Sequence, residues 1–262
     1  MLFRSNFSVG QNFTASEPWP RVTVKQYTAA INYDTASMRV ELLREMGAVM
    51  PRGGGAPFFG EQRQVQLVIG DFAWNAPAAG AQGQPAPQPG AALERRLALW
   101  ATPVGFVKAA RANNATTRMA GRNTEVSFLV GGKYRMTGLI NPQGHVEKVT
   151  TWIDHPIVGD MPVVTTYSGY RDFGGVTFPS RIVQTQDGFV SLDLAISAVT
   201  SSDDVKPFIA AGASAAWAIA QPATIAIVAT KILRMNSSLW DASPCGAMRS
   251  EEHTSELQSL RH

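Results

Sequence analysis

The stretch KYRMTGLINPQGHVEKVTTWID, residues 133–154, decides the fold class. Polar and apolar residues alternate along residues 133–140 and again along residues 145–154, which is the period of a half-buried β-strand. Between them, Asn141-Pro142-Gln143-Gly144 is a run of turn-forming residues. The stretch therefore predicts two antiparallel strands joined by a short turn.

The same alternation continues on both sides of this stretch, between clusters of turn residues. Further strand candidates are residues 21–33, 37–46, 61–75, 123–130, 161–170, 176–184 and 189–199. No strand alternates with a helix in the manner of a parallel α/β protein. The pattern predicts a mainly β (α+β) protein, with a curved antiparallel sheet or unclosed half-barrel of about nine strands.

One segment has the helical period instead. Leu93, Leu97, Trp100 and Val104 recur at helical spacing, which predicts helices within residues 93–114. A proline inside a helix costs about 3 kcal/mol. We therefore expect Pro103 to divide this single helical insertion into two short helices.

Changes of composition mark the limits of the domain. Residues 78–92 contain only Pro, Gly, Gln and Ala, which predicts a mobile loop. The β-rich domain is expected to span residues 6–204. Residues 205–232 are interpreted as a linker with a possible last strand at 223–231, whereas residues 233–248 show no period and support no assignment.

The two ends of the chain differ from the rest. Residues 1–5 and 249–262 resemble translated sequencing adapter, and the second of these is a polar, acidic run after a Val-, Ala- and Gly-rich chain. Such segments are excluded from fold reasoning. We expect that removing both segments leaves the melting temperature unchanged.

Charge and cysteine content exclude several classes of function. The chain has 23 Lys and Arg against 20 Asp and Glu, without a basic run, so no nucleic-acid partner is expected. Its one cysteine, Cys245, lies outside the β-rich domain, which excludes a disulfide scaffold and a cysteine-ligated zinc site there.

No set of residues in the sequence predicts catalysis. His145 and His155 lie in turn settings at opposite ends of one predicted strand and could not share a metal ion. There is no G-x-S-x-G nucleophile motif, and the aspartates of the later strands stand beside turn residues. We therefore predict no catalytic residue, no metal ligand and no cofactor in this chain.

Two sets of stretches resemble known families. YSGYRDFGGVTFPSRIV, residues 167–183, followed by residues 193–199, resembles the late strands of lipoprotein-carrier-like (LolA/LolB-type) periplasmic domains. The resemblance implies an unclosed antiparallel barrel with an apolar concave face, capped by helices, with residues 93–114 as the lid.

Residues 5–45, 112–118 and 131–154 are similar to the β-rich N-terminal region of exported bacterial metallo-β-lactamase-fold (MBL-fold) hydrolases. In that family a His-x-His-x-Asp-His motif in the following domain supplies the zinc ligands, and this chain lacks the motif. The similarity implies a truncated, non-catalytic N-terminal domain. Its partner would be the missing C-terminal catalytic domain, where zinc is expected.

Three functional interpretations follow. The first is a scaffold or apolar-ligand-binding domain of such an exported hydrolase. The alternative is a stand-alone periplasmic carrier of lipid or lipoprotein. The third is a small membrane-anchored protein held by residues 208–230, which are 23 residues without a charge. Candidate residues for an apolar groove are aromatic, although for each taken singly a place in the core is the favoured interpretation: Trp100, Phe106, Phe128, Tyr134 and Trp152.

Overall fold

The computed structural model describes residues 22–46, 60–78, 82–155, 159–202, 224–229 and 231–235. Both predicted adapter segments lie outside the described residues, as do residues 203–223. Most of the segment considered as a membrane anchor is therefore not described. Among the described residues, no helix combines the length and apolar character needed to cross a membrane.

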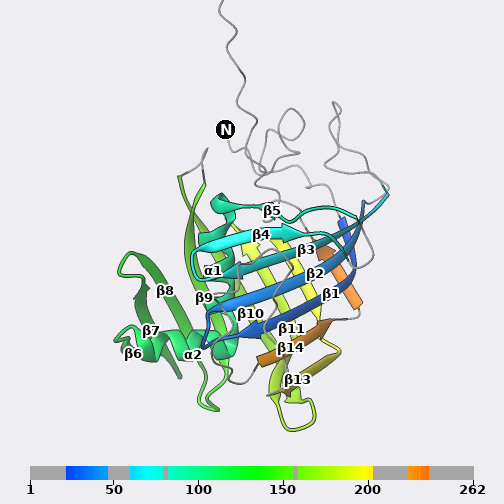
Figure 1. Ribbon diagram of the computed structural model, residues 1–262. Coiled ribbons are helices and arrows are strands. Elements are labelled where there is room, and N and C mark those ends of the chain that lie inside the picture. The colour runs from blue at the N-terminus through cyan, green and yellow to red at the C-terminus, as the bar shows by residue number, and fades with distance from the viewer. Residues whose placement is uncertain are drawn as a thin grey trace, which may run out of the picture.

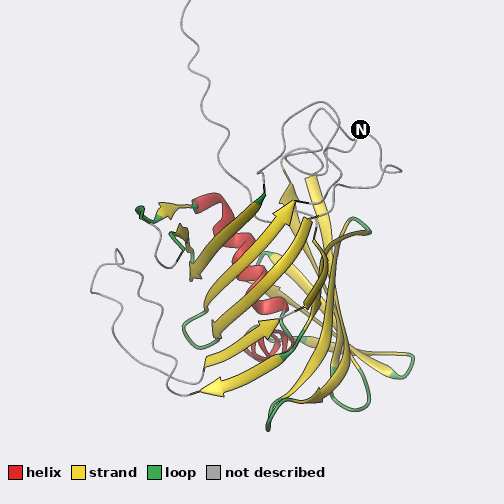
Figure 2. Cartoon of the chain, turned by 90° about the vertical axis from the view of Figure 1, so that its right-hand side faces the viewer, coloured by secondary structure: helices red, strands yellow, loops and turns green. Residues whose placement is uncertain are grey.

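The described strands form one open antiparallel sheet (Figures 1 and 2). Its main path runs β5-β4-β3-β2-β1-β15-β12-β11-β10-β9-β8-β7-β6, and β13 and β14 branch from it. Because β5 and β6 end the path without pairing to each other, the sheet is unclosed. The strands are β1 (Val22–Asn32), β2 (Ser37–Met46), β3 (Glu61–Ile69), β4 (Phe72–Ala76), β5 (Ala86–Pro87), β6 (Thr116–Ala120), β7 (Asn123–Val130), β8 (Tyr134–Ile140), β9 (Val146–His155), β10 (Gly159–Asp172), β11 (Thr177–Gln186), β12 (Phe189–Ala195), β13 (Ala198–Ser202), β14 (Thr224–Ala229) and β15 (Lys231–Met235).

The curved antiparallel sheet with a helical insertion confirms the predicted fold class, but the strand number was wrong. The described sheet has 15 strands, whereas the sequence predicted about nine. The predicted strand at residues 61–75 is a hairpin, since the backbone turns at Gly70 with a φ of 53°. Short strands such as β5, β6 and β13 contain too few residues to show alternation.

Strands β14 and β15 connect the first and last parts of the sheet. The end of β1 from Tyr27 to Asn32 pairs with β14, while Val22 at its start pairs with Met235 of β15. β14 also pairs with β13, and β15 pairs with β12. The predicted last strand at residues 223–231 thus corresponds to β14, and it lies between strands that are far apart in sequence.

The helical insertion lies inside the curve of the sheet (Figure 2). It consists of α1 (Ala92–Ala101) and α2 (Pro103–Ala112), so the predicted break at the proline is confirmed. Thr102 between them is extended, and its side chain accepts a hydrogen bond of 3.3 Å from the Gly105 amide. This cap satisfies one of the free amides at the start of α2.

The segment predicted as a mobile loop has structure in its second half. β5 pairs with β4, and the Gln88 amide donates to the Ala73 carbonyl at 2.8 Å. A 3₁₀ turn at Pro89–Ala91 then leads into α1, and Ala91 and Ala92 are buried. The second half of this segment thus connects the sheet edge directly to the start of α1.

The helices divide the interior into two apolar clusters. One lies among β1, β2, β11 and β12 with Leu99 of α1, and the other lies among α1, α2 and β7 to β10. The side chain of Trp100 packs against both clusters. Burial of α1 against both walls of the sheet therefore helps to hold the helix in the concavity.

Glu94, in the first turn of α1, should make stability depend on pH. Burial raises the pKa of Glu94 from 4.5 to about 8, and the nearby charge of Arg95 offsets part of this. Between these two values the folded protein holds a proton that the unfolded chain has released. The free energy of unfolding should therefore fall as pH rises through this window, by up to roughly 1.4 kcal/mol per pH unit.

Replacing Glu94 by glutamine tests this expectation. Urea unfolding of the parent and of Glu94→Gln should show a flatter pH dependence for the variant between about pH 5 and about pH 8. At the upper end the variant should be the more stable, on the order of 2 kcal/mol with allowance for partial exposure. Parallel curves for the two proteins would contradict a raised pKa of Glu94 in the folded protein.

Candidate functional site: an apolar cavity beneath the first helix

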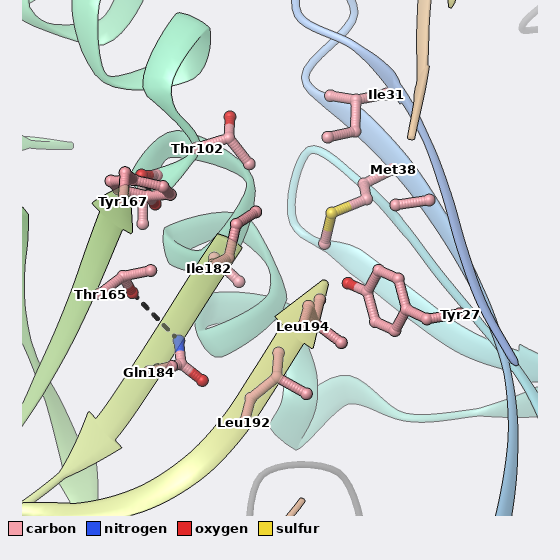
Figure 3. Close-up of a pocket in the computed structure, with 13 residues that line it drawn as sticks. Tyr27, Ile31, Met38, Thr102, Thr165, Tyr167, Ile182, Gln184, Leu192 and Leu194 are labelled. Atoms are coloured by element: carbon pink, nitrogen blue, oxygen red, sulfur yellow. Dashed lines mark hydrogen bonds between the residues drawn. The ribbon is translucent and has the colours of Figure 1, made fainter. Parts of the chain in front are cut away.

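A partly open cavity lies between two walls of the sheet, beneath α1 (Figure 3). One wall consists of β1 and β2, and the other of β10, β11 and β12. The end of α1 and Thr102 form its roof. The described residues that line it are Tyr27, Ala29, Ile31, Met38, Ala98, Ala101, Thr102, Thr165, Tyr167, Ile182, Gln184, Leu192 and Leu194.

Strand periodicity explains which side chains reach the cavity. Lining residues on each strand are two apart, as with Ala29 and Ile31 on β1 or Leu192 and Leu194 on β12. Alternate residues of a strand point to the same face of the sheet. Met38 on β2 stands directly opposite Ile31 in the register. The concave face of the sheet is therefore apolar on both sides of the space.

The roof leaves space because its side chains are small. Ala98 and Ala101 are three residues apart on α1 and so lie on one face of the helix. A larger side chain at either position would extend into the space. The cavity measures about 70 Å³, below the roughly 150 Å³ of an engineered apolar cavity that holds benzene.

Two tyrosines from opposite walls hold the roof in position. The hydroxyl of Tyr33, which follows β1, lies 3.0 Å from the Thr102 hydroxyl. The Tyr167 hydroxyl on β10 donates a hydrogen bond to the Ala101 carbonyl. Burial raises the pKa of Tyr33 to about 12, so that its phenol stays neutral. The junction between the helices is thus fixed to both walls.

The polar groups of the cavity are uncharged. Gln184 donates a hydrogen bond of 3.4 Å to the Thr165 hydroxyl, and Figure 3 shows the Tyr27 hydroxyl on the opposite wall. Burial raises the pKa of Tyr27 to about 12. None of the described lining residues is Asp, Glu, Lys, Arg or His. Since burying an unpaired charge is costly, the cavity suits a neutral, apolar group.

The aromatic residues predicted as a groove lie elsewhere. Phe106 and Phe128 are buried in the second cluster, with ring centroids 5.3 Å apart, and Tyr134 packs against that cluster. Trp100 lies between the two clusters. Trp152 is 36% exposed on β9. The structure brings Phe106 and Phe128 together, but none of the five is among the described lining residues of the cavity.

The described histidine side chain has a structural contact. The ring of His145 stacks on that of Tyr170, with centroids 4.2 Å apart. The Tyr170 hydroxyl donates to the Val146 carbonyl at 2.6 Å. Within the described part of the chain, no three His, Cys, Asp or Glu side chains are grouped to hold a metal ion.

The residues that line the cavity were missed at the sequence level. Many of these residues are small or aliphatic, and in the sequence they cannot be distinguished from ordinary core residues of each strand. The helical pair Ala98 and Ala101 was the available signal, because small residues facing a core leave space unless a neighbour fills it. Whether a neighbour fills it depends on the two walls, whose lining residues fall within 27–38 and 165–194 and are therefore far from the helix along the chain.

Comparisons with known proteins give one likeness in structure. No protein-family model matches the sequence, and no curated protein matches it. The chain is similar to a LolA superfamily protein from Nitrosomonas europaea of known crystal structure, at 11% identity and a TM-score of 0.33. The alignment covers 84% of this chain and 88% of that chain. A likeness at this level does not decide function.

Proposed function

We propose that this chain is a binding protein for a neutral apolar ligand, held in the cavity between the two walls of the sheet. The supporting observation is a cavity lined by aliphatic side chains and uncharged polar groups. This corresponds to the alternative interpretation of the sequence, a carrier-like protein.

The size of the cavity narrows the class of ligand. At about 70 Å³, it is smaller than the roughly 300 to 1,000 Å³ of a typical small-molecule pocket. A whole lipid therefore does not fit without movement of the walls. The end of an acyl chain, inserted with its polar head outside, matches both the volume and the lack of charge. We propose that the ligand is an amphiphile that binds tail first.

The other two functional interpretations of the sequence, the hydrolase fragment and the membrane-anchored protein, stay predictions. The hydrolase-fragment interpretation, with its catalytic partner domain and its zinc, depends on sequence that this chain does not contain. The membrane-anchor interpretation concerns residues that are mostly outside the described part of the chain. Export to the periplasm also remains a proposal.

A variant that fills the cavity tests the proposal. Ala98→Leu adds three carbon atoms to the roof and should abolish saturable binding of a fluorescent fatty acid by the full chain. Because the leucine fills an apolar space, the free energy of unfolding should rise by about 1 kcal/mol. Ala112→Leu, at an exposed position of α2, is the matched control and should bind like the parent.

A second variant keeps the test informative if Ala98→Leu misfolds. Met38→Ala enlarges the space from the opposite wall and should allow tighter binding of the same probe, although it should lower stability. Decanol should displace the probe, because the head group is expected to remain outside. Unchanged binding in both Ala98→Leu and Met38→Ala would overturn this location for the ligand.

A further inference from the structure

A second hollow lies on the other face of the sheet, over β6 to β9. It is an open groove of about 520 Å³, within the size range of small-molecule sites. On β7, Val126 and Phe128 point into the apolar core, whereas Glu125 and Ser127 line the groove. Alternation along the strand therefore separates this groove from the cavity beneath α1.

A row of hydroxyl groups crosses the floor of the groove. The register places Thr116 opposite Ser127, Ser127 opposite Thr137, and Thr137 opposite Thr150. The hydroxyls of Ser127 and Thr137 lie 3.3 Å apart. Hydroxyl groups both donate and accept hydrogen bonds and rotate to suit a partner. The row can thus follow a ligand that itself carries several hydroxyls.

Positive charge flanks this row. Arg118, Arg135 and Lys148 line the groove together with one carboxylate, that of Glu125, which leaves a net charge of +2 (three minus one). Arg118 donates to Glu125 at 2.6 Å, and its hydrogen bond is the main cause of the lowered pKa of Glu125. Within the described part of the chain, neither Arg135 nor Lys148 makes a direct ion pair, although the charge of Lys148 also contributes to the lowered pKa of Glu125. They can therefore bind an anionic group.

Trp152 supplies an aromatic surface beside these groups. It lines the groove from β9 and is 36% exposed, although large aromatic side chains are usually more deeply buried. An exposed indole next to hydrogen-bonding groups and cations provides an apolar face for a ring and polar partners at its rim.

We propose that this groove binds an acidic carbohydrate, with one carboxylate or phosphate on Arg135 and another on Lys148, since the register places the two cations four residues apart along the strands. The sugar hydroxyls would lie along the Thr116–Thr150 row and one ring face would lie on Trp152. A neutral sugar lacks the group that the cations bind, and an acidic peptide lacks the hydroxyls. The anionic sugar is either free in solution or part of a glycolipid head group.

The test measures binding of oligogalacturonate to the full chain by calorimetry and by tryptophan fluorescence. Maltotriose, polyglutamate and vesicles of anionic phospholipid serve as comparison ligands. Oligogalacturonate should bind in preference to maltotriose and polyglutamate. Arg135→Gln and Lys148→Gln should each weaken binding roughly tenfold, because each removes one charge-assisted contact.

Matched controls distinguish binding in the groove from a general effect of net charge and from binding in the cavity beneath α1. Arg122→Gln and Lys133→Gln remove the same charge at exposed positions outside the groove, and should leave affinity unchanged. Trp152→Phe should remove most of the fluorescence change, and Ala98→Leu should have no effect. Competition by vesicles that carry an acidic glycolipid would indicate a glycolipid head group as the ligand, and a lack of competition would indicate a free sugar.

Three results would overturn the proposal. The first is equal binding of polyglutamate, which would indicate non-specific attraction. The second is binding of anionic phospholipid vesicles without binding of oligogalacturonate, which would indicate a membrane surface. The third is a lack of binding to every ligand.

Discussion

Replacing Arg95 by methionine is expected to lower the free energy of unfolding by about 3 kcal/mol. The side chain is 1% exposed, and Nη1 donates to the carbonyls of Leu67 at 3.0 Å and Trp74 at 2.8 Å. Nη2 donates to Asn75 Oδ1 at 2.7 Å. Hydrogen bonds to a charged group contribute roughly 1.5 to 3 kcal/mol each, and the cost of desolvating the guanidinium offsets part of this.

The loss should appear as a lower melting temperature, by roughly 6 to 12 °C for a domain of this size. Arg96→Met is the control, because Arg96 makes a surface ion pair with Asp71, and such pairs contribute about 0 to 1 kcal/mol. Equal losses in the two variants would show that Arg95 does not fasten α1 to β3 and β4. Arg95→Lys should recover only part of the stability, because lysine cannot reproduce the fork of donors.

Replacing Gly138 by alanine is expected to lower the free energy of unfolding by about 2 to 3 kcal/mol. A Cβ at this position of β8 would lie less than 3.0 Å from three atoms of the Phe106 ring. Phe106 is fully buried, and its ring packs against that of Phe128. Overpacking of a core forces side chains out of their preferred rotamers or moves the backbone, which typically costs 1 to about 3 kcal/mol.

A double-mutant cycle tests whether the clash with Phe106 causes the loss of stability in Gly138→Ala. Phe106→Leu removes ring atoms from the clash, so Gly138→Ala should cost less in that background, with a coupling of about 1 kcal/mol or more. Gly90→Ala is the control, since a Cβ there would meet nothing within 4 Å. Its effect should stay within about 0.5 kcal/mol. Strictly additive losses would mean that Gly138 is required for some reason other than Phe106.

The fold was largely predictable, whereas the candidate site was not. Alternation marked the long strands, and Pro103 marked the break between the helices, because both signals are local. The five residues predicted for a groove all have large aromatic side chains. In the structure Phe106 fills the space over Gly138, whereas the cavity lies where Ala98 and Ala101 leave space. Large side chains fill space, so size alone could not locate an empty volume.

The sequence by itself determined the local properties of this protein: strand periodicity, turn positions, the two short helices and the absence of a basic run. Only the tertiary structure decided that β14 and β15 lie between β1 and β12, and that the cavity and the groove occupy opposite faces of one sheet. The physical reason is the range of the interactions. Backbone preferences act between near neighbours, whereas strand order and packing depend on many small contacts between residues far apart in the chain.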